Sequence, residues 1–222
     1  MKQFKNTLLG SILLVGLFAC NKSTFNLTPL SSLEIVNTVP ASPGARLFGN
    51  PNAVAYGSYG QFGLLAGNNA QIYVWPTGDS LHPYYNSNLA AVNGGIYSLY
   101  LTGTDPQKNT LLLKDTIPSY SDSSMGIRFI NLSPDSGPVN INIAGAANGS
   151  SVPSLPYTSI TSFMTFSANS ANSGGYNFEI RNASDSLLAA YSQNIIPFKN
   201  VTIVINGMLS DGSFAAFTVN NY

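Results

Sequence analysis

Short stretches of alternating apolar and polar residues recur along the chain. Residues 139–143 (Val-Asn-Ile-Asn-Ile) and 201–203 (Val-Thr-Ile) place an apolar side chain at every second position, which is the period of a strand with one buried face. Residues 97–101 follow the same pattern, with a tyrosine on the outer face. No apolar stripe with the helical period of 3.6 residues follows residue 20. The pattern predicts an all-β protein made of half-buried antiparallel strands.

The chain also repeats itself once. Four blocks recur in the same order: residues 33–40 with 127–134, 56–62 with 157–163, 72–88 with 178–194, and 97–103 with 201–207. The dipeptides Asp79-Ser80 and Asp185-Ser186 lie between strand-like runs, and Asn93-Gly94 is a strong hairpin signal. We predict two tandem β-sandwiches with immunoglobulin-like layering, at 33–117 and 125–222, joined by a linker at 118–124. The alternative is one sandwich or barrel built from both halves.

The N-terminus has the proportions of a signal peptide. Lys2 and Lys5 precede an apolar run from Leu8 to Phe18, which is too short to cross a bilayer as a helix. Residues 17–20 (Leu-Phe-Ala-Cys) resemble the bacterial lipoprotein signal, the lipobox, although Phe18 is bulky for its position. The resemblance implies cleavage after residue 19 and acylation of Cys20. We therefore expect a signal peptide at 1–19, a lipidated cysteine with a flexible tether at 20–32, and a membrane partner held through the lipid anchor.

Composition narrows the possible partners and compartments. Only 8% of the 222 residues are charged, and seven basic residues face nine acidic ones once Lys2 and Lys5 leave with the leader. This balance offers no basic patch for phosphates, so nucleic acid is not an expected partner. Cys20 is the only cysteine, which excludes an intrachain disulfide. We expect a cell-envelope protein anchored at the outer membrane, facing either the periplasm or the surface.

The residue types needed for common catalytic sites are scarce. His82 is the only histidine, and we interpret it as a chance polar residue on a strand, so neither a His-based triad nor a zinc site is expected. Asp79, Asp135 and Asp185 are interpreted as turn caps, and no calcium loop motif occurs. No catalytic residue, metal or cofactor is therefore predicted, and the protein is not expected to be an enzyme. A hydrolase with two carboxylates brought together by the fold is the third hypothesis.

Residues 127–135 (Ile-Arg-Phe-Ile-Asn-Leu-Ser-Pro-Asp), followed by 139–145 (Val-Asn-Ile-Asn-Ile-Ala-Gly), are similar to the opening of a bacterial family. This family is a domain of unknown function in exported proteins, with a pattern close to V-R-F-x-N/H-x-S-P-D-x-P-x-V-D-V. Residues 203–207 resemble its closing segment, and residues 33–103 resemble a more divergent copy. Asn140 departs from the pattern, because many relatives have Asp there. The resemblance implies a tandem β-sandwich lipoprotein and no reaction or substrate.

One group of residues is a candidate ligand site. If Ile72 and Val74 face the core, Tyr73 and Trp75 face outward, and Tyr84 and Tyr85 follow after the next turn. Exposed rings would suit a glycan or a protein partner; alternatively they pack between the two domains or under a loop. We therefore expect a non-enzymatic binding, adhesion or spacer lipoprotein, and as an alternative a glycan-capturing lipoprotein that uses an aromatic platform.

Overall fold

The computed structural model describes residues 28–104 and 107–221, and its fold is all-β. The first eight strands are β1 (Leu30–Asn37), β2 (Ala45–Leu47), β3 (Ala53–Val54), β4 (Ser58–Leu65), β5 (Gly67–Pro76), β6 (Tyr85–Ala91), β7 (Ile96–Thr104) and β8 (Gln107–Lys114). The others are β9 (Ser124–Asn131), β10 (Val139–Ile143), β11 (Val152–Leu155), β12 (Met164–Ser167), β13 (Tyr176–Arg181), β14 (Leu187–Gln193), β15 (Asn200–Asn206) and β16 (Ala215–Asn221). A 3-10 turn, η2 (Ser170–Asn172), is the one helical element in the described ranges.

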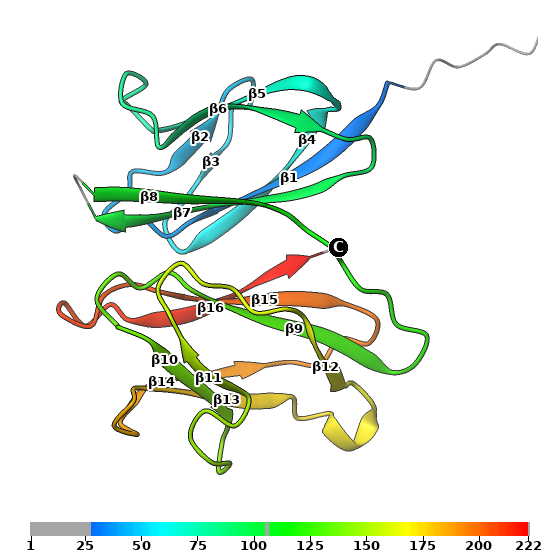
Figure 1. The fold of residues 1–222 in the computed structure, drawn as a ribbon, viewed down its shortest axis with the longest axis vertical. Coiled ribbons are helices and arrows are strands. Elements are labelled where there is room, and N and C mark those ends of the chain that lie inside the picture. Colours follow the sequence, from blue (N-terminus) through cyan, green and yellow to red (C-terminus); the bar gives the residue numbers. More distant parts are fainter. Residues whose placement is uncertain (1–27, 105–106, 222) are drawn as a thin grey trace, which may run out of the picture.

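The strands form four four-stranded sheets (Figure 1). Strands β1–β8 make an inner sheet, in the order β4-β1-β7-β8, and an outer sheet, in the order β3-β2-β5-β6. Strands β9–β16 repeat this arrangement with β12-β9-β15-β16 inside and β11-β10-β13-β14 outside. Each strand therefore has a counterpart eight strands later. The chain has two similar halves, consistent with two tandem β-sandwiches, and we refer to them as the first and second sandwich.

Each sandwich has its own hydrophobic core between its two sheets. Leu33, Ile35, Ile72, Val74 and Leu99 are fully buried in the first core. The corresponding positions of the second core are filled by an equally buried set: Ile127, Phe129, Phe178, Ile180 and Ile203. Alternation along the strands sends these side chains inward and their neighbours outward, as the pattern predicts.

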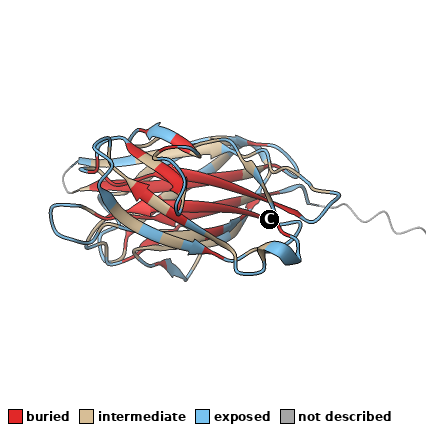
Figure 2. Ribbon diagram, turned by 90° about the horizontal axis from the view of Figure 1, so that it is seen from below, coloured by how far each residue is buried: buried red, intermediate tan, exposed pale blue. Residues whose placement is uncertain are grey.

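A third cluster joins the two sandwiches, because the inner sheets pack against each other (Figures 1 and 2). Its buried members come from both halves: Val36, Tyr100, Ile130, Leu132, Val204 and Val219. The prediction that all strands are half-buried is therefore wrong for β1, β7, β9 and β15, which are covered on nearly their whole length from both sides. Tyr100, on the face predicted to be outer, is fully buried in this interface.

The inner sheets are also mixed rather than purely antiparallel. Strand β1 pairs in parallel with β7, and β9 pairs in parallel with β15, whereas the other pairs are antiparallel. Parallel strands are typical of sheets covered on both faces. The packing of one sandwich on the other supplies that second cover.

The first strand begins earlier than the predicted domain boundary at Leu33. Leu30, Ser31 and Ser32 belong to β1, and the Ser31 hydroxyl donates a hydrogen bond to the Leu64 carbonyl. The predicted tether therefore ends before Leu30, because these polar residues find a partner strand in β4. The predicted signal peptide and Cys20 lie outside the described residues. Within those residues, no helix is long and apolar enough to cross a membrane.

The asparagine shared by the first pair of repeated blocks has the same role in each sandwich. Asn37 and Asn131 are fully buried at the ends of β1 and β9. Each side-chain amide donates to a carbonyl of the neighbouring outer strand, at Val54 and at Leu155. Each side-chain oxygen accepts the backbone N–H two residues later. The recurrence of this residue reflects one polar link between the inner and outer sheets in each half.

We expect Asn131→Ala to lower the free energy of unfolding by about 2 kcal/mol, because it leaves buried backbone groups without partners. Asn37→Ala should cost a similar amount, since its contacts match. Denaturant unfolding would measure both. Asn220→Ala is the control, because this exposed residue bonds the Tyr59 hydroxyl at the surface and should change stability by less than about 0.5 kcal/mol. Equal losses in all three variants would contradict the assigned role.

Candidate functional site

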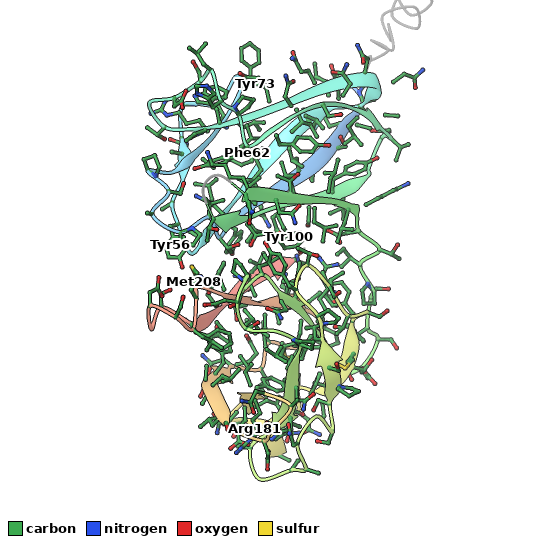
Figure 3. All side chains as sticks on the ribbon, turned by 60° about the vertical axis from the view of Figure 1, so that its left-hand side comes forward. Tyr56, Phe62, Tyr73, Tyr100, Arg181 and Met208 are labelled. Carbon is green, nitrogen blue, oxygen red and sulfur yellow. The ribbon has the colours of Figure 1, made fainter. Side chains whose placement is uncertain are left out.

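The outer face of the first sandwich carries a row of aromatic side chains. Tyr73 and Trp75 alternate on β5 with the buried Ile72 and Val74, so both rings point away from the core. Their centroids are 5.4 Å apart, and the ring planes are tilted by 46°. Figure 3 shows the Tyr73 side chain at one end of the molecule's long axis. Both rings are half-buried, so one side of the pair remains accessible to a ligand.

Two further side chains join this row, one from β2 and one from the residue that follows its end. Arg46 pairs with Trp75 across the antiparallel β2–β5 ladder, and the backbone N–H of Phe48 bonds the Tyr73 carbonyl. In that register Arg46 and Phe48 point to the same outer side as Trp75 and Tyr73. Phe48 is 69% exposed. We call Arg46, Phe48, Tyr73 and Trp75 the aromatic face.

The aromatic face has polar groups available for a ligand. Asn86 and Asn88 on β6 lie opposite Tyr73 and Gln71, and all three amide side chains are exposed. The Nε of Arg46 is buried and has no hydrogen-bond partner among the described residues. The Tyr73 hydroxyl, by contrast, donates to the Ser80 carbonyl at 2.5 Å, which fixes the ring. A rigid ring platform beside amides and a guanidinium can stack on a flat apolar surface while bonding hydroxyl groups around it.

Tyr84 and Tyr85 do not belong to this face. Tyr84 is buried in the first core, where its hydroxyl lies 2.9 Å from the Ser42 hydroxyl. Tyr85 begins β6 and packs partly buried against the same core. The structure therefore separates the four tyrosine and tryptophan residues that were predicted as one group, because the β5–β6 turn returns Tyr84 and Tyr85 to the inner side.

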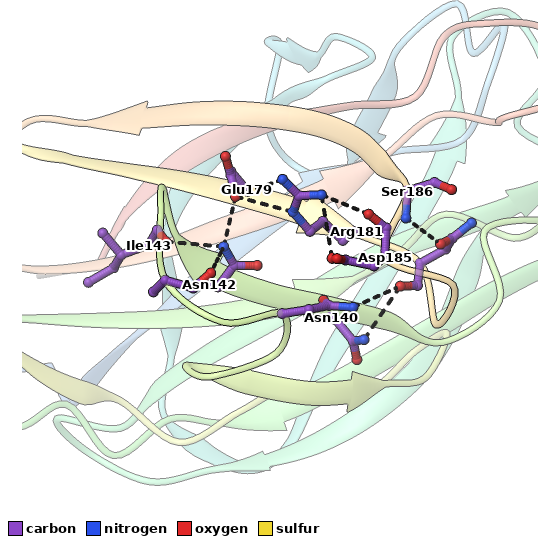
Figure 4. A network of polar contacts seen from close by, with 10 residues as sticks. Asn140, Asn142, Ile143, Glu179, Arg181, Asp185 and Ser186 are labelled. Atoms are coloured by element: carbon purple, nitrogen blue, oxygen red, sulfur yellow. Dashed lines mark hydrogen bonds and ion pairs between the residues drawn. The ribbon is translucent and has the colours of Figure 1, made fainter.

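The same positions in the second sandwich hold a polar network instead (Figure 4). Matching the registers of β2–β5 and β10–β13 places Asn140 at the position of Arg46, Asn142 at Phe48, Glu179 at Tyr73 and Arg181 at Trp75. Asn142 donates to Glu179 at 2.8 Å, and Arg181 pairs with the same carboxylate at 3.1 Å. The hydrogen bonds from Asn142 and Arg181 hold the pKa of Glu179 below its usual value.

The second network is also covered by its own chain. The β10–β11 connection runs from 144 to 151, whereas the β2–β3 connection runs only from 48 to 52. Within the longer loop the Ala146 carbonyl accepts from Asn142, and Asn148 donates to the Asn182 carbonyl. The loop and the network therefore engage the Glu179 carboxylate, the Arg181 guanidinium and the Asn142 and Asn148 amide nitrogens, although the side-chain oxygens of the two asparagines have no partner among the described residues. Among the described residues of the first sandwich, the shorter β2–β3 connection gives the aromatic face no comparable cover and leaves Phe48 exposed.

A second cluster of functional groups lies between the sandwiches. Arg128 on β9 donates to Asp115 at 2.6 Å, to the Tyr100 hydroxyl at 3.2 Å and, through Nε, to Thr202 at 2.8 Å. The side chains of Arg128 and Asp115 are only 7% and 2% exposed. The Phe163 ring stacks on the guanidinium, with its centroid 4.5 Å away. This buried ion pair fixes the first sandwich against the second.

Glu34 on β1 adjoins this ion pair and has a strongly perturbed pKa. Burial raises the pKa of Glu34 to about 7, and the nearby Asp115 carboxylate adds to the increase. Hydrogen bonds from Gln61 and Ser98 partly offset this effect. The Ser98 hydroxyl also donates to Asp115, so Glu34 and Asp115 converge on one group.

The two converging carboxylates are poorly placed for catalysis. Glu34 is 1% exposed, and the cleft of about 460 Å³ beside the interface is lined by Asp115 and Arg128 but not by Glu34. A substrate in that cleft would not meet both acids. The prediction that His82 lies on a strand is wrong, because it is in the loop after β5, where its Nδ1 is 2.9 Å from Asp79. In the described ranges no three His, Cys, Asp or Glu side chains gather into a possible metal site.

Comparison of the chain with known protein families finds no matching family model, and comparison with curated proteins finds no significant match. The site must therefore be interpreted from its own geometry.

Sequence reasoning identified Tyr73 and Trp75 but missed Arg46 and Phe48. These two residues lie 25 or more positions earlier in the chain; Arg46 is on a three-residue strand, and Phe48 directly follows it, which is too short a segment to give an alternation signal. The available signal was the duplication itself. It aligns Arg46 and Phe48 with Asn140 and Asn142, which alternate clearly on the second strand of the other copy.

Proposed function

We propose that the protein is a non-enzymatic lipoprotein of the cell envelope that binds a ligand through its aromatic face. The observation that carries this proposal is the difference between the two outer faces. One copy of a duplicated sandwich ties Glu179 and Arg181 into a network under its own loop, whereas the other presents the rings of Phe48, Tyr73 and Trp75 beside exposed amide side chains. Exposed rings with free hydrogen-bonding groups indicate a binding surface.

A glycan is the ligand class that this face favours. Aromatic rings can stack on the apolar faces of sugar rings, and amides and a guanidinium can bond the surrounding hydroxyl groups. Arg46 is the one charged residue among the four that form the face, so stacking and neutral hydrogen bonds, rather than several ion pairs, would hold a ligand there. A protein partner is the alternative, and a glycan array with a purified protein counter-screen would separate the two classes.

The layering also suits a binding or spacer role. We propose immunoglobulin-like sandwiches in the sense of two packed sheets per half. The strand order differs from the immunoglobulin constant type, in which the first two strands share a sheet, because β1 and β2 lie in different sheets here. The buried contacts between the inner sheets support a rigid pair rather than two sandwiches moving on a linker.

The resemblance to the exported domain of unknown function is part of this proposal and rests on the motif at 127–135.

Membrane anchoring at Cys20 is tested by metabolic labelling with an alkyne fatty acid. We expect label in the wild type and none in Cys20→Ala, which should also leave the membrane fraction. Protease added to intact cells then reports the side of the outer membrane: digestion places the aromatic face outside the cell, and protection places it in the periplasm. Labelling that persists in Cys20→Ala would contradict the proposed anchor.

We expect Trp75→Ala to weaken glycan binding by at least about 10-fold, equivalent to about 1.4 kcal/mol, since it removes one of the stacking rings. Because Trp75 is the only tryptophan, its fluorescence should also change when a glycan binds to the wild type. Arg181→Ala, at the matching position of the second sandwich, is the control and should leave affinity unchanged. Equal losses in both variants, or an unaltered Trp75 emission at saturation, would argue against this site.

A further inference from the structure

Three segments of the first sandwich meet where the chain enters β1. Leu30 pairs with Leu65 at the end of β4. The Leu30 carbonyl accepts from Gly94 at 2.7 Å, and its N–H donates to the Asn93 side chain at 3.1 Å. The connections after β4 and β6 therefore lie beside the start of the strand. Figure 1 shows the start of β1 at this end, beside the connection from β4 to β5.

The three segments that meet at this end expose aliphatic side chains and contain no charged residue, and Lys114 lies beside them, opposite Tyr97 at the end of β8. Leu30, Leu65 and Val92 are 53%, 64% and 47% exposed; we call them the apolar rim. A groove of about 410 Å³ lies beside Leu65, lined by residues 63–67 and 69–71. The three contributing segments, 28–33, 63–71 and 89–97, contain no Asp, Glu, Lys, Arg or His. Single exposed apolar residues are common, but an uncharged group of them marks an interaction surface.

The opposite end of the strands is different. The β5–β6 connection there contains Asp79 and His82, which interact with each other. In the second sandwich, the hairpin tips at the same end contain Asp185 and Asp211. Ionic groups resist transfer to a lipid interface, whereas uncharged Gly, Ala and Asn segments with aliphatic side chains do not. The segments that form the apolar rim thus differ from the β5–β6 connection at the opposite end in the property that decides contact with lipid.

The length of the segment between Cys20 and β1 indicates which surface can cover the apolar rim. Leu30 follows Cys20 by ten positions, so an acylated Cys20 lies within about 35 Å of the apolar rim even if the chain is fully extended. We propose that the apolar rim rests on the lipid surface into which Cys20 is acylated, a step that depends on the anchor proposed above. The strands of the first sandwich then point away from the membrane, and the aromatic face is turned sideways, where a ligand can reach it.

Site-specific quenching tests this contact on the full lipidated chain. Acylation consumes the only native thiol, so Leu65→Cys and, as a matched control at the far hairpin, Leu81→Cys can each carry one fluorescent label. Both leucines are well exposed, at 64% and 84%. In vesicles of phosphatidylethanolamine and phosphatidylglycerol with nitroxide-labelled lipid, we expect quenching at position 65 to exceed that at position 81 by at least about three-fold. Adding Leu30→Ser and Val92→Ser should reduce the quenching at position 65 at least two-fold.

Flotation of the same vesicles separates the two proposals. If the protein floats but the labels at 65 and 81 are quenched equally, the apolar rim does not contact lipid, and the anchor is unaffected. A protein that fails to float overturns the anchor and the rim contact together. Shielding of position 65 in detergent, accompanied by a dimer in light scattering, would assign the apolar rim to a second copy of the chain and overturn the lipid contact.

Discussion

Replacing Arg128 by methionine is expected to lower the free energy of unfolding by about 3–5 kcal/mol, the largest effect of any single substitution considered. Methionine keeps much of the apolar stem but removes the charge. Asp115 would then remain a buried carboxylate without its cation, and the Tyr100 hydroxyl and Thr202 would each lose a partner. Equilibrium denaturation at pH 7 measures the loss.

The size of this effect follows from the surroundings of the guanidinium. Burial alone would lower the pKa of Arg128, but the Tyr100 hydroxyl and the Asp115 carboxylate raise it, so the group stays charged. Breaking a buried pair is far more costly than never having formed it, because the remaining charge keeps its desolvation penalty. Arg128→Met together with Asp115→Asn should therefore recover at least half of the lost stability.

Arg181→Met provides the control for the loss of an arginine in general. Arg181 pairs with Glu179 on the outer face, where both side chains retain contact with solvent, so its removal should cost about 1 kcal/mol or less. A comparable loss at the two arginines would show that the interface location is unimportant. A loss below about 1 kcal/mol for Arg128→Met would indicate that water enters through the adjoining cleft and hydrates Asp115.

The strand pattern and the duplication could be predicted from the sequence because each depends on local order. Alternation at 139–143 and 201–203 correctly marked β10 and β15. The burial of the outer side of β7 could not be predicted in this way. Tyr100 reads as an exposed ring until the second sandwich is placed against it, and packing between halves leaves no local pattern. The same holds for Arg128. A charged residue in a strand is expected to face water, and its burial becomes apparent only when the two sandwiches are packed together.

The aligned blocks match the structure in most of their length, with two exceptions. Phe62 pairs with Leu33 and therefore corresponds to Met164, which pairs with Ile127, rather than to Phe163. The third block shifts within the hairpin of the outer sheet. Val74 pairs with Tyr85, whereas Ile180, its counterpart, pairs with Ala189. The first hairpin therefore contains two additional residues, and Tyr85 is not the counterpart of Tyr191. Turn residues mark where a hairpin reverses but do not fix its length. This uncertainty is also why Tyr84 and Tyr85 were grouped with Tyr73 and Trp75, although they return to the core side.

Replacing Glu34 by glutamine is expected to stabilise the protein at pH 8 relative to the wild type, and to have little effect near pH 4.5. The carboxyl is buried between the sandwiches, where its oxygens accept from Gln61, Ser98 and Asn221. Glutamine preserves the shape and lacks the charge. The exposed Gln61 amide can turn to accept from the new amide group, so the bonds can be remade.

The pH dependence follows from the direction of the shift. The folded-state pKa of Glu34 is about 7, above its ordinary value of 4.5, so between these values the folded protein holds a proton that the unfolded chain has lost. The stability of the wild type therefore falls as pH rises from about 4.5 to 7, by about 3 kcal/mol, and this contribution is constant at higher pH. Glu34→Gln removes this fall, and the difference between the two proteins should appear within that window.

Glu179→Gln is the matched control, and its pH dependence should have the opposite sign. The pKa of Glu179 is lowered by Asn142 and Arg181, so its carboxylate stabilises the folded state at neutral pH, and this contribution is lost as pH falls through the folded pKa. The Glu179 variant should therefore be less stable than the wild type at pH 7 and nearly equal to it in acid. Denaturation curves at several pH values would test both variants. A constant difference between wild type and Glu34→Gln from pH 4.5 to 8 would mean that Glu34 is already ionised in the folded interface, with Arg128 compensating its charge.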